Sequence, residues 1–184
     1  MKKTIITVIG YDQPGIISSV TDILLKEKCN VENISQTILQ SQFAGIFIVL
    51  MPEELSPNSL EEIFNKHFSD KDINIQVKRL DSEKIIPSPQ ETDPFILTTN
   101  GPDKLGLVAG ISKEISDFGI NISNLKAVFK GGDNPDSNIM IYEIDIPLSV
   151  DFQIFSDKLR EKAGSLNLDI SIQHKNIFDM INRI

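Results

Sequence analysis

One loop motif occurs twice in this chain, and its second copy begins 91 positions after the first. The motif spans residues 10–15 and 101–106, and an aliphatic residue follows each copy. The same shift carries a pair of asparagines from one half of the chain to the other. The residues that recur in this register are Gly10, Asp12, Gly15, Asn30 and Asn33, which match Gly101, Asp103, Gly106, Asn121 and Asn124. A repeat that keeps a loop and a second motif in register indicates a duplicated domain.

Each copy of the loop lies between a predicted strand and a predicted helix. The apolar runs at 4–9 and 95–99 contain several β-branched residues, which is typical of strands. After each loop, apolar residues recur at spacings of three and four, which places them on one side of a helix. Pro14 suits the first helical position, and Asp12 and Asp103 stand where a carboxylate can cap free N–H groups. We therefore predict a strand-to-helix turn at each loop.

The remainder of each half repeats one order of elements. The first half has predicted strands at 35–42, 46–50 and 73–77, a turn at Ala44-Gly45, and a helix at 59–66. The second half has predicted strands at 126–130, 139–146 and 170–174, a polar hairpin loop at 131–138, and a helix at 152–162. This order is βαββαβ, the ferredoxin-like arrangement. The fold class is therefore α+β, with two tandem units, each an antiparallel sheet with its helices on one face.

The chain length and the proline-rich middle set the domain boundaries. The 184 residues fit two domains of about 80–90 residues each, which is a normal domain size. We predict a first domain at 1–80, a linker at 81–93, a second domain at 94–175, and a short C-terminal helix at 176–184. The last of these rests on four apolar residues at helical spacing.

The composition excludes several classes of function. The formal net charge is -8 and the pI about 4.8, which argues against general nucleic-acid binding, since that depends on Lys and Arg against phosphates. No apolar run approaches the roughly 18 residues of a membrane span, and the N-terminus lacks a signal-peptide cleavage site, so we expect a cytoplasmic protein. The single cysteine, Cys29, is interpreted as a small buried hydrophobe. His67 and His174 have no Cys partners, so no metal site is predicted.

The combined pattern resembles the ACT domain. The resemblance depends on the strand, the Gly-x-Asp-x-Pro-Gly turn, the helix, and Asn-x-x-Asn at the next strand, and it covers nearly the whole chain twice. It extends to two-domain members of the family that regulate transcription of the glycine cleavage system. The second copy departs from the pattern by having Leu105 where the first has Pro14, which makes its loop less rigid.

The resemblance implies a regulatory protein that binds a small, glycine-like amino acid. In the family, the loop after the first strand of one unit faces the start of the second strand of another. The ligand-binding residues implied in this way are Asp12, Gln13, Pro14, Gly15, Asn30 and Asn33 in the first copy and Asp103, Leu105, Gly106, Asn121 and Asn124 in the second. The chain has no helix-turn-helix and no basic stripe, so we expect any control of transcription to act through a protein partner such as a DNA-binding regulator. We also expect a homodimer, since a second chain would cover the sheets and complete the sites.

Elementary chemistry is consistent with these residues but leaves simpler roles open. A helix start offers unpaired N–H groups to a carboxylate, and an aspartate or asparagine oxygen can accept from an ammonium. The glycines could equally serve only a tight turn, and the aspartates only as helix caps. Asn30 and Asn121 are more typical of the turn that ends a helix than of a ligand contact.

Three functions compete at this point. The first is a non-enzymatic amino-acid sensor that modulates a protein partner, with a pure interaction module or a regulatory subunit as the alternative. The second is an enzyme, which is disfavoured because the chain has no nucleophile elbow, P-loop or HExxH motif and no Arg in either loop. The third is an RNA-binding domain, which is disfavoured because the central strands offer only Phe47 and Tyr142 for base stacking. We predict no cofactor.

Overall fold

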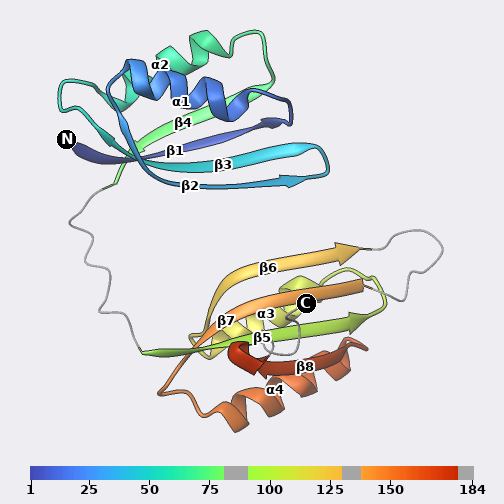
Figure 1. Ribbon diagram of the computed structural model, residues 1–184. Helices are drawn as coiled ribbons and strands as arrows, with labels where there is room; N and C mark the ends of the chain where they lie inside the picture. The colour runs from blue at the N-terminus through green and yellow to red at the C-terminus, as the bar shows by residue number, and fades with distance from the viewer. Residues whose placement is uncertain (81–90, 130–137, 178–184) are drawn as a thin grey trace. The chain divides into compact units, whose positions relative to one another are not determined.

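The structure is a computed structural model that describes residues 1–80, 91–129 and 138–177 (Figure 1). The chain divides into two compact units, Met1–Ile86 and Pro87–Ile184. Most of the predicted linker at 81–93, of the hairpin loop at 131–138 and of the C-terminal helix at 176–184 lies outside the described residues. The strand after the linker begins at Thr92, inside the range predicted as linker.

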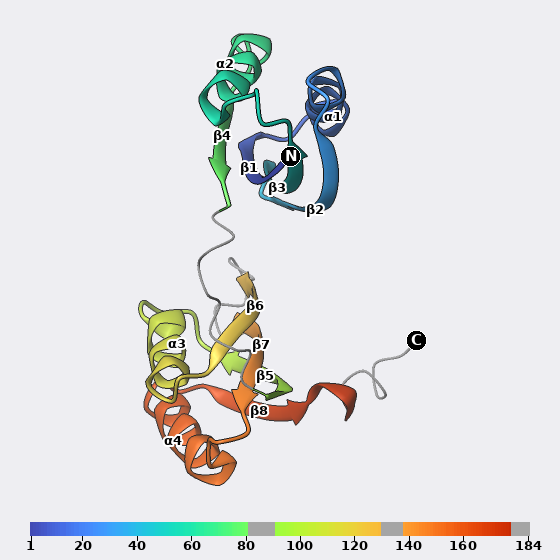
Figure 2. The same cartoon turned by 90° about the vertical axis from the view of Figure 1, so that its left-hand side faces the viewer.

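The first unit is one antiparallel sheet covered on one face by two helices, as Figure 2 shows. Along the chain its elements are β1 (Lys2–Tyr11), α1 (Ile16–Lys26), β2 (Asn30–Leu39), β3 (Gln42–Met51), α2 (Pro57–His67) and β4 (Ile73–Arg79). In the sheet the strands follow the order β2-β3-β1-β4. The predicted run at 46–50 therefore belongs to a central strand.

The second unit has the same topology. Its elements are β5 (Thr92–Gly101), α3 (Leu107–Asp117), β6 (Asn121–Phe129), β7 (Asn138–Pro147), α4 (Phe152–Ser165) and β8 (Asp169–His174). The strand order is β6-β7-β5-β8. The predicted fold class, two tandem βαββαβ units, is confirmed. α3 ends before Gly119, whose φ of 68° is the left-handed conformation that commonly stops a helix.

Each unit buries its own apolar cluster between sheet and helices. The buried residues of α1 are Ile16, Val20, Ile23 and Leu24, and those of α3 are Leu107, Ile111 and Ile115. Among the described residues, the members of the first cluster come only from the first unit and those of the second only from the second. No helix in the described part of the chain is long and apolar enough to span a membrane.

The hairpin between β2 and β3 corrects one prediction. The turn lies at Gln40 and Ser41, with φ values of 47° and 65°, and not at residues 44–45. Two successive left-handed residues form the tight turn that matches strand twist, although neither residue type is usual there. Gly45 lies inside β3, where a Cβ would come within 2.9 Å of the Phe43 ring. Its lack of a side chain therefore serves packing.

A β-bulge recurs at the same place in both units. The pairing of β2 with β3 shifts between Val31 and Asn33, and that of β6 with β7 shifts between Ile122 and Asn124. Each bulge holds one extra residue and so reverses the alternation of side chains beyond it. As a result Asn33 and Asn124 face away from the helices.

Candidate functional site

Each strand-to-helix loop turns into its helix through a glycine. Gly15 and Gly106 occupy the N-cap positions with φ values of 96° and 88°, and neither helix has a side-chain cap. The prediction that Asp12 and Asp103 cap these helices is therefore wrong. The physical reason is that a left-handed glycine takes the capping position and carries no side chain.

Pro14 also lies elsewhere than predicted. It stands two residues before Ile16, the first residue of α1, so it is not at the first helical position. It belongs instead to the loop, where its fixed φ limits the conformations open to the chain. The backbone N–H of Asp12 donates to the carbonyl of Ser41, 2.8 Å away, and this bond ties the loop to the β2–β3 hairpin. The first N–H groups of α1 have no side-chain cap.

A cleft of about 580 Å³ lies at the first of these loops. Asp12, Gln13 and Gly15 line it together with the first turns of α1. Three further lining residues come from the sheet, namely Gln36, Ile38 and Phe43. These three were not predicted from the sequence, because their approach to the loop depends on tertiary packing and no local motif marks them.

A cleft of similar size, also about 580 Å³, lies at the second loop. It is lined by residues 103–109, so it includes Asp103, Leu105 and Gly106. Leu105 is fully exposed. Asp103 accepts a hydrogen bond from Nδ2 of Asn138, 3.5 Å away on β7. Asn138 is a further residue of this region that no sequence pattern indicated.

Within each unit, the predicted asparagines lie far from the loop. Asn30 pairs with Leu50 at one end of the sheet, whereas the first loop follows β1 at the other end. Asn33 is five residues away along β2 from Ile38, the strand residue at the cleft, which corresponds to about 17 Å. It also faces the opposite side of the sheet. No single unit therefore brings loop and asparagines together.

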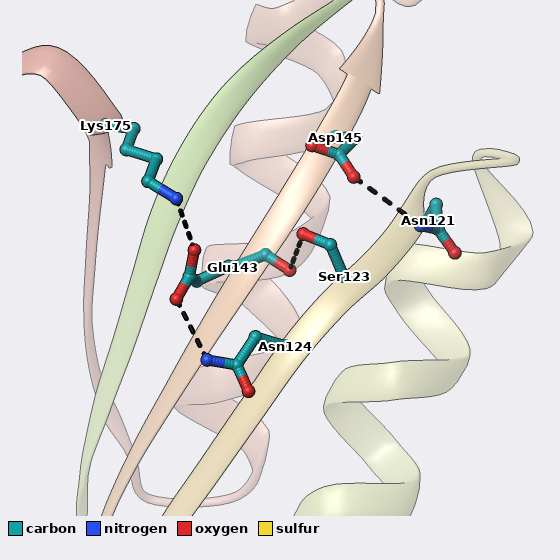
Figure 3. Close-up of polar contacts among 6 residues, drawn as sticks. All are labelled: Asn121, Ser123, Asn124, Glu143, Asp145 and Lys175. Atoms are coloured by element: carbon teal, nitrogen blue, oxygen red, sulfur yellow. Dashed lines mark hydrogen bonds and ion pairs between the residues drawn. The ribbon is translucent and has the colours of Figure 1, made fainter. Parts of the chain in front are cut away.

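In the second unit the asparagines belong to a polar cluster on the helix-free face of the sheet (Figure 3). Asn124 Nδ2 donates to Glu143 Oε1 at 2.9 Å, and Lys175 Nζ donates to the other oxygen of Glu143 at 2.6 Å. Asn121 Nδ2 lies 3.5 Å from Asp145 Oδ2. The hydrogen bonds from Asn124 and Lys175 hold the pKa of Glu143 below its usual value.

The first unit lacks such a cluster in the part of it that the structure describes. Ile48 lies opposite Asn33, where Glu143 lies opposite Asn124 in the second unit. Within the described residues, the side chains of Asn30 and Asn33 make no hydrogen bond and both are exposed. The amide of Asn33 is thus open to a ligand or partner, while that of Asn124 is already paired.

The histidines and the cysteine take part in packing. His67 packs edge-on against Phe68 and His174 against Phe95, with ring centroids 4.8 and 5.2 Å apart. Cys29 is buried, and burial together with nearby Glu27 raises the pKa of its thiol. In the described part of the chain, no group of three His, Cys, Asp or Glu residues could hold a metal ion.

Comparison with known proteins extends this picture. A family model described as an ACT domain matches residues 2–78. A UPF0237 protein of Methanopyrus kandleri is 33% identical over 82 residues, which are 44% of this chain and 91% of that protein. Among solved structures, an unknown protein from Galdieria sulphuraria matches with a TM-score of 0.75 and 20% identity, over 94% of this chain and 98% of its own.

A second solved structure is that of a protein provisionally named as a glycine cleavage system transcriptional repressor. It matches with a TM-score of 0.68 and 16% identity, over 94% of this chain and 96% of its own. At these identities the two crystal structures establish the fold alone. The curated relative, in contrast, shares enough sequence along most of its length to establish kinship.

Proposed function

This chain belongs to the UPF0237 family of ACT-domain proteins, and from that premise we propose that it is a non-enzymatic regulatory protein that binds a small amino acid. The proposed ligand is a free amino acid of the size of glycine. The observation that carries the proposal is the pair of clefts, each at a helix start that has no side-chain cap.

The first cleft offers complementary groups to both charges of an amino acid. The uncapped N–H groups at the start of α1 suit a carboxylate, since they are unpaired donors at the positive end of the helix dipole. The Asp12 carboxylate, which lines the same cleft, suits an ammonium. Gly15 has no Cβ, so the ligand can approach the backbone closely.

The size of the ligand limits its affinity. Glycine has about five heavy atoms, and at the ceiling of about 1.5 kcal/mol per atom it binds no more tightly than roughly micromolar. Such a site responds to changes in metabolite concentration. We propose further that Asn33 contributes from a second ACT unit, because the Asn33 of the same unit lies too far from the loop.

Ligand binding is tested by a thermal-shift screen of the common amino acids on the full chain. We expect one or more small amino acids to raise the melting temperature, and Asp12→Ala and Asn33→Ala each to reduce the rise. Asp22→Ala is the matched control, since it removes a carboxylate from α1 outside the cleft, and it should leave the rise unchanged. A screen in which no amino acid raises the melting temperature would contradict the proposal.

The regulated process is proposed from the shared fold. The likeness to the protein named as a glycine cleavage repressor supports a role in controlling glycine cleavage through a protein partner, such as a DNA-binding regulator. Glycine should then change the amount of that partner recovered with the chain in a co-purification from the native organism. If the amount of partner recovered does not change with any amino acid, the result would instead favour the alternative of an interaction module without ligand sensing.

A further observation supports association with a second chain. Ile9, Tyr11 and Ile46 are exposed on the helix-free face of the first sheet, and neighbouring exposed apolar residues often mark a contact surface. A second copy of the chain is the proposed occupant, which gives a homodimer. Sedimentation equilibrium on Ile46→Lys checks this: a monomer is expected for the variant and a dimer for the parent chain.

A further inference from the structure

Position 43 of the first unit and position 138 of the second occupy the same place in their sheets. Phe43 lies opposite Gly10, and Asn138 lies opposite Gly101. Phe43 is buried and lines the first cleft. Asn138 is also buried, at 1% exposure, but it is polar. Its Nδ2 donates to Asp103, whereas its Oδ1 has no hydrogen-bond partner among the described residues. A buried, unpaired acceptor therefore lies beside the loop of the second cleft.

A second buried polar residue lies next to Asn138. Thr99 takes the place that Val8 has in the first unit, and both side chains are fully buried. In the part of the chain that the structure describes, the Thr99 hydroxyl also lacks a hydrogen-bond partner. Thr99 pairs with Met140, two residues from Asn138 on β7, so the two polar residues are diagonal neighbours, with Cα atoms about 7–8 Å apart. Both face the helices.

These two oxygens require an explanation, because buried polar atoms in native proteins nearly always have partners. In the first unit the same two positions are apolar, so the fold itself does not need polar groups there. The second cleft borders Asn138, since Asp103 both lines the cleft and accepts the hydrogen bond from Asn138 Nδ2. A group that enters through the cleft is therefore the candidate partner.

We propose that the second cleft selects a small amino acid whose side chain carries a hydroxyl group, such as serine. Asn138 Oδ1 accepts a hydrogen bond from the ligand hydroxyl, and the Thr99 hydroxyl donates one to the ligand oxygen. Phe43 and Val8, at the equivalent positions of the first unit, offer no such bonds. This inference rests on the proposed function, since it names the ligand class of one of the two proposed sites.

The test compares serine with 2-aminobutyrate, which has nearly the same shape but a methyl group in place of the hydroxyl. Titration calorimetry on the full chain carrying Asp12→Ala, which weakens the first cleft, reports the second. Serine should bind about tenfold or more tightly than 2-aminobutyrate, because a site built for a hydroxyl rejects ligands that lack it. Thr99→Val, nearly equal in shape, should reduce this ratio to about one, and so should Asn138→Leu.

The controls separate this inference from the proposed function. Val8→Thr places a hydroxyl at the equivalent position of the first unit and should leave the ratio unchanged. Equal binding of the two ligands, or a preference for serine that survives both variants, would overturn the inference while amino-acid binding stands; a buried water would then satisfy the two oxygens. Binding of no amino acid by the parent chain would overturn the proposed function itself. Thr99→Val and Asn138→Leu each remove one of the two oxygens, so the result for one variant tests the inference if the other variant does not fold.

Discussion

Gly15 and Gly106 hold a backbone conformation that residues with a Cβ rarely adopt. We expect Gly15→Ala and Gly106→Ala each to lower the free energy of unfolding by about 1 kcal/mol or more. The strain is conformational, since a methyl group at Gly15 would come no closer than 3.8 Å to its nearest neighbour and one at Gly106 would meet open space. Gly164→Ala is the control, because that glycine lies in α4 with open space around it, and alanine should stabilise it by about 0.5–1 kcal/mol. Urea unfolding measures the free energy of unfolding of all three variants. Equal changes at the three positions would contradict a conformational strain specific to Gly15 and Gly106.

Glu143 gives the second prediction at this scale. Its pKa in the folded chain is lowered by hydrogen bonds from Asn124 and Lys175. A carboxylate whose pKa is depressed on folding contributes stability above its unfolded pKa, and that contribution is lost as the pH falls through the folded pKa. The free energy of unfolding of the parent chain should therefore exceed that of Glu143→Gln by more at pH 7 than below the ordinary glutamate value of 4.5.

The same pKa can be observed directly. In a carbon NMR titration, Asn124→Ala should raise the pKa of Glu143 toward its ordinary value, because it removes the hydrogen bond that lowers this pKa most. Asn121→Ala, which removes a neighbouring amide that contacts Asp145 instead, should leave the pKa of Glu143 unchanged. A pKa that does not respond to either substitution would show that Asn124 does not act on Glu143 in solution.

At the scale of elements, the helices α1 to α4 begin in two different ways. α2 and α4 are capped by side chains: Ser56 accepts from the N–H of Ser59, and Asp151 accepts from the N–H groups of Gln153 and Ile154. α1 and α3 begin at a glycine and have no side-chain cap. The capped helices thus serve stability, whereas the two uncapped starts leave donors available at the clefts.

This contrast predicts that two substitutions of aspartate differ in their effect on the free energy of unfolding. Asp151→Ala should lower the free energy of unfolding by about 1 kcal/mol, because it removes a cap. Asp12→Ala should change it by less than about 0.5 kcal/mol, as is usual away from caps and core, even though the proposed function expects it to weaken amino-acid binding. Thermal unfolding without ligand measures both. A large loss for Asp12→Ala would mean that this residue has a structural role.

The elements also show which features the sequence could predict. The repeat and the apolar periodicity predicted the order of the elements α1–α4 and β1–β8, since both follow from local patterns. The turn at Gln40 and Ser41 could not be predicted, because neither residue type favours a positive φ. Gln36 and Phe43 approach the first loop only through strand pairing. The bulge decides which face Asn33 occupies, and no residue type marks it.

At the scale of the whole molecule, the described part of the chain contains two cores with no shared members. Leu24→Ala should therefore destabilise the first unit by about 2–5 kcal/mol and leave hydrogen exchange in β5–β8 unchanged. Ile111→Ala should destabilise the second unit and leave hydrogen exchange in β1–β4 unchanged, since Ile111 is fully buried in the second cluster. Hydrogen-exchange mass spectrometry reports each unit separately. Faster exchange in both units for either variant would contradict independent cores.

The paired bulges have a consequence for how these strands tolerate length changes. Glu32 and Ser123 are the supernumerary residues at the two register shifts. Deletion of Glu32 would make the pairing of β2 with β3 regular, because Val31 and Asn33 would still point to opposite sides of the sheet. Loss of Ser35 instead would invert part of the strand. In each of the edge strands β2 and β6, one residue can thus be deleted without turning the side chains that follow to the wrong face of the sheet. Deletion of a residue further along the strand would turn them.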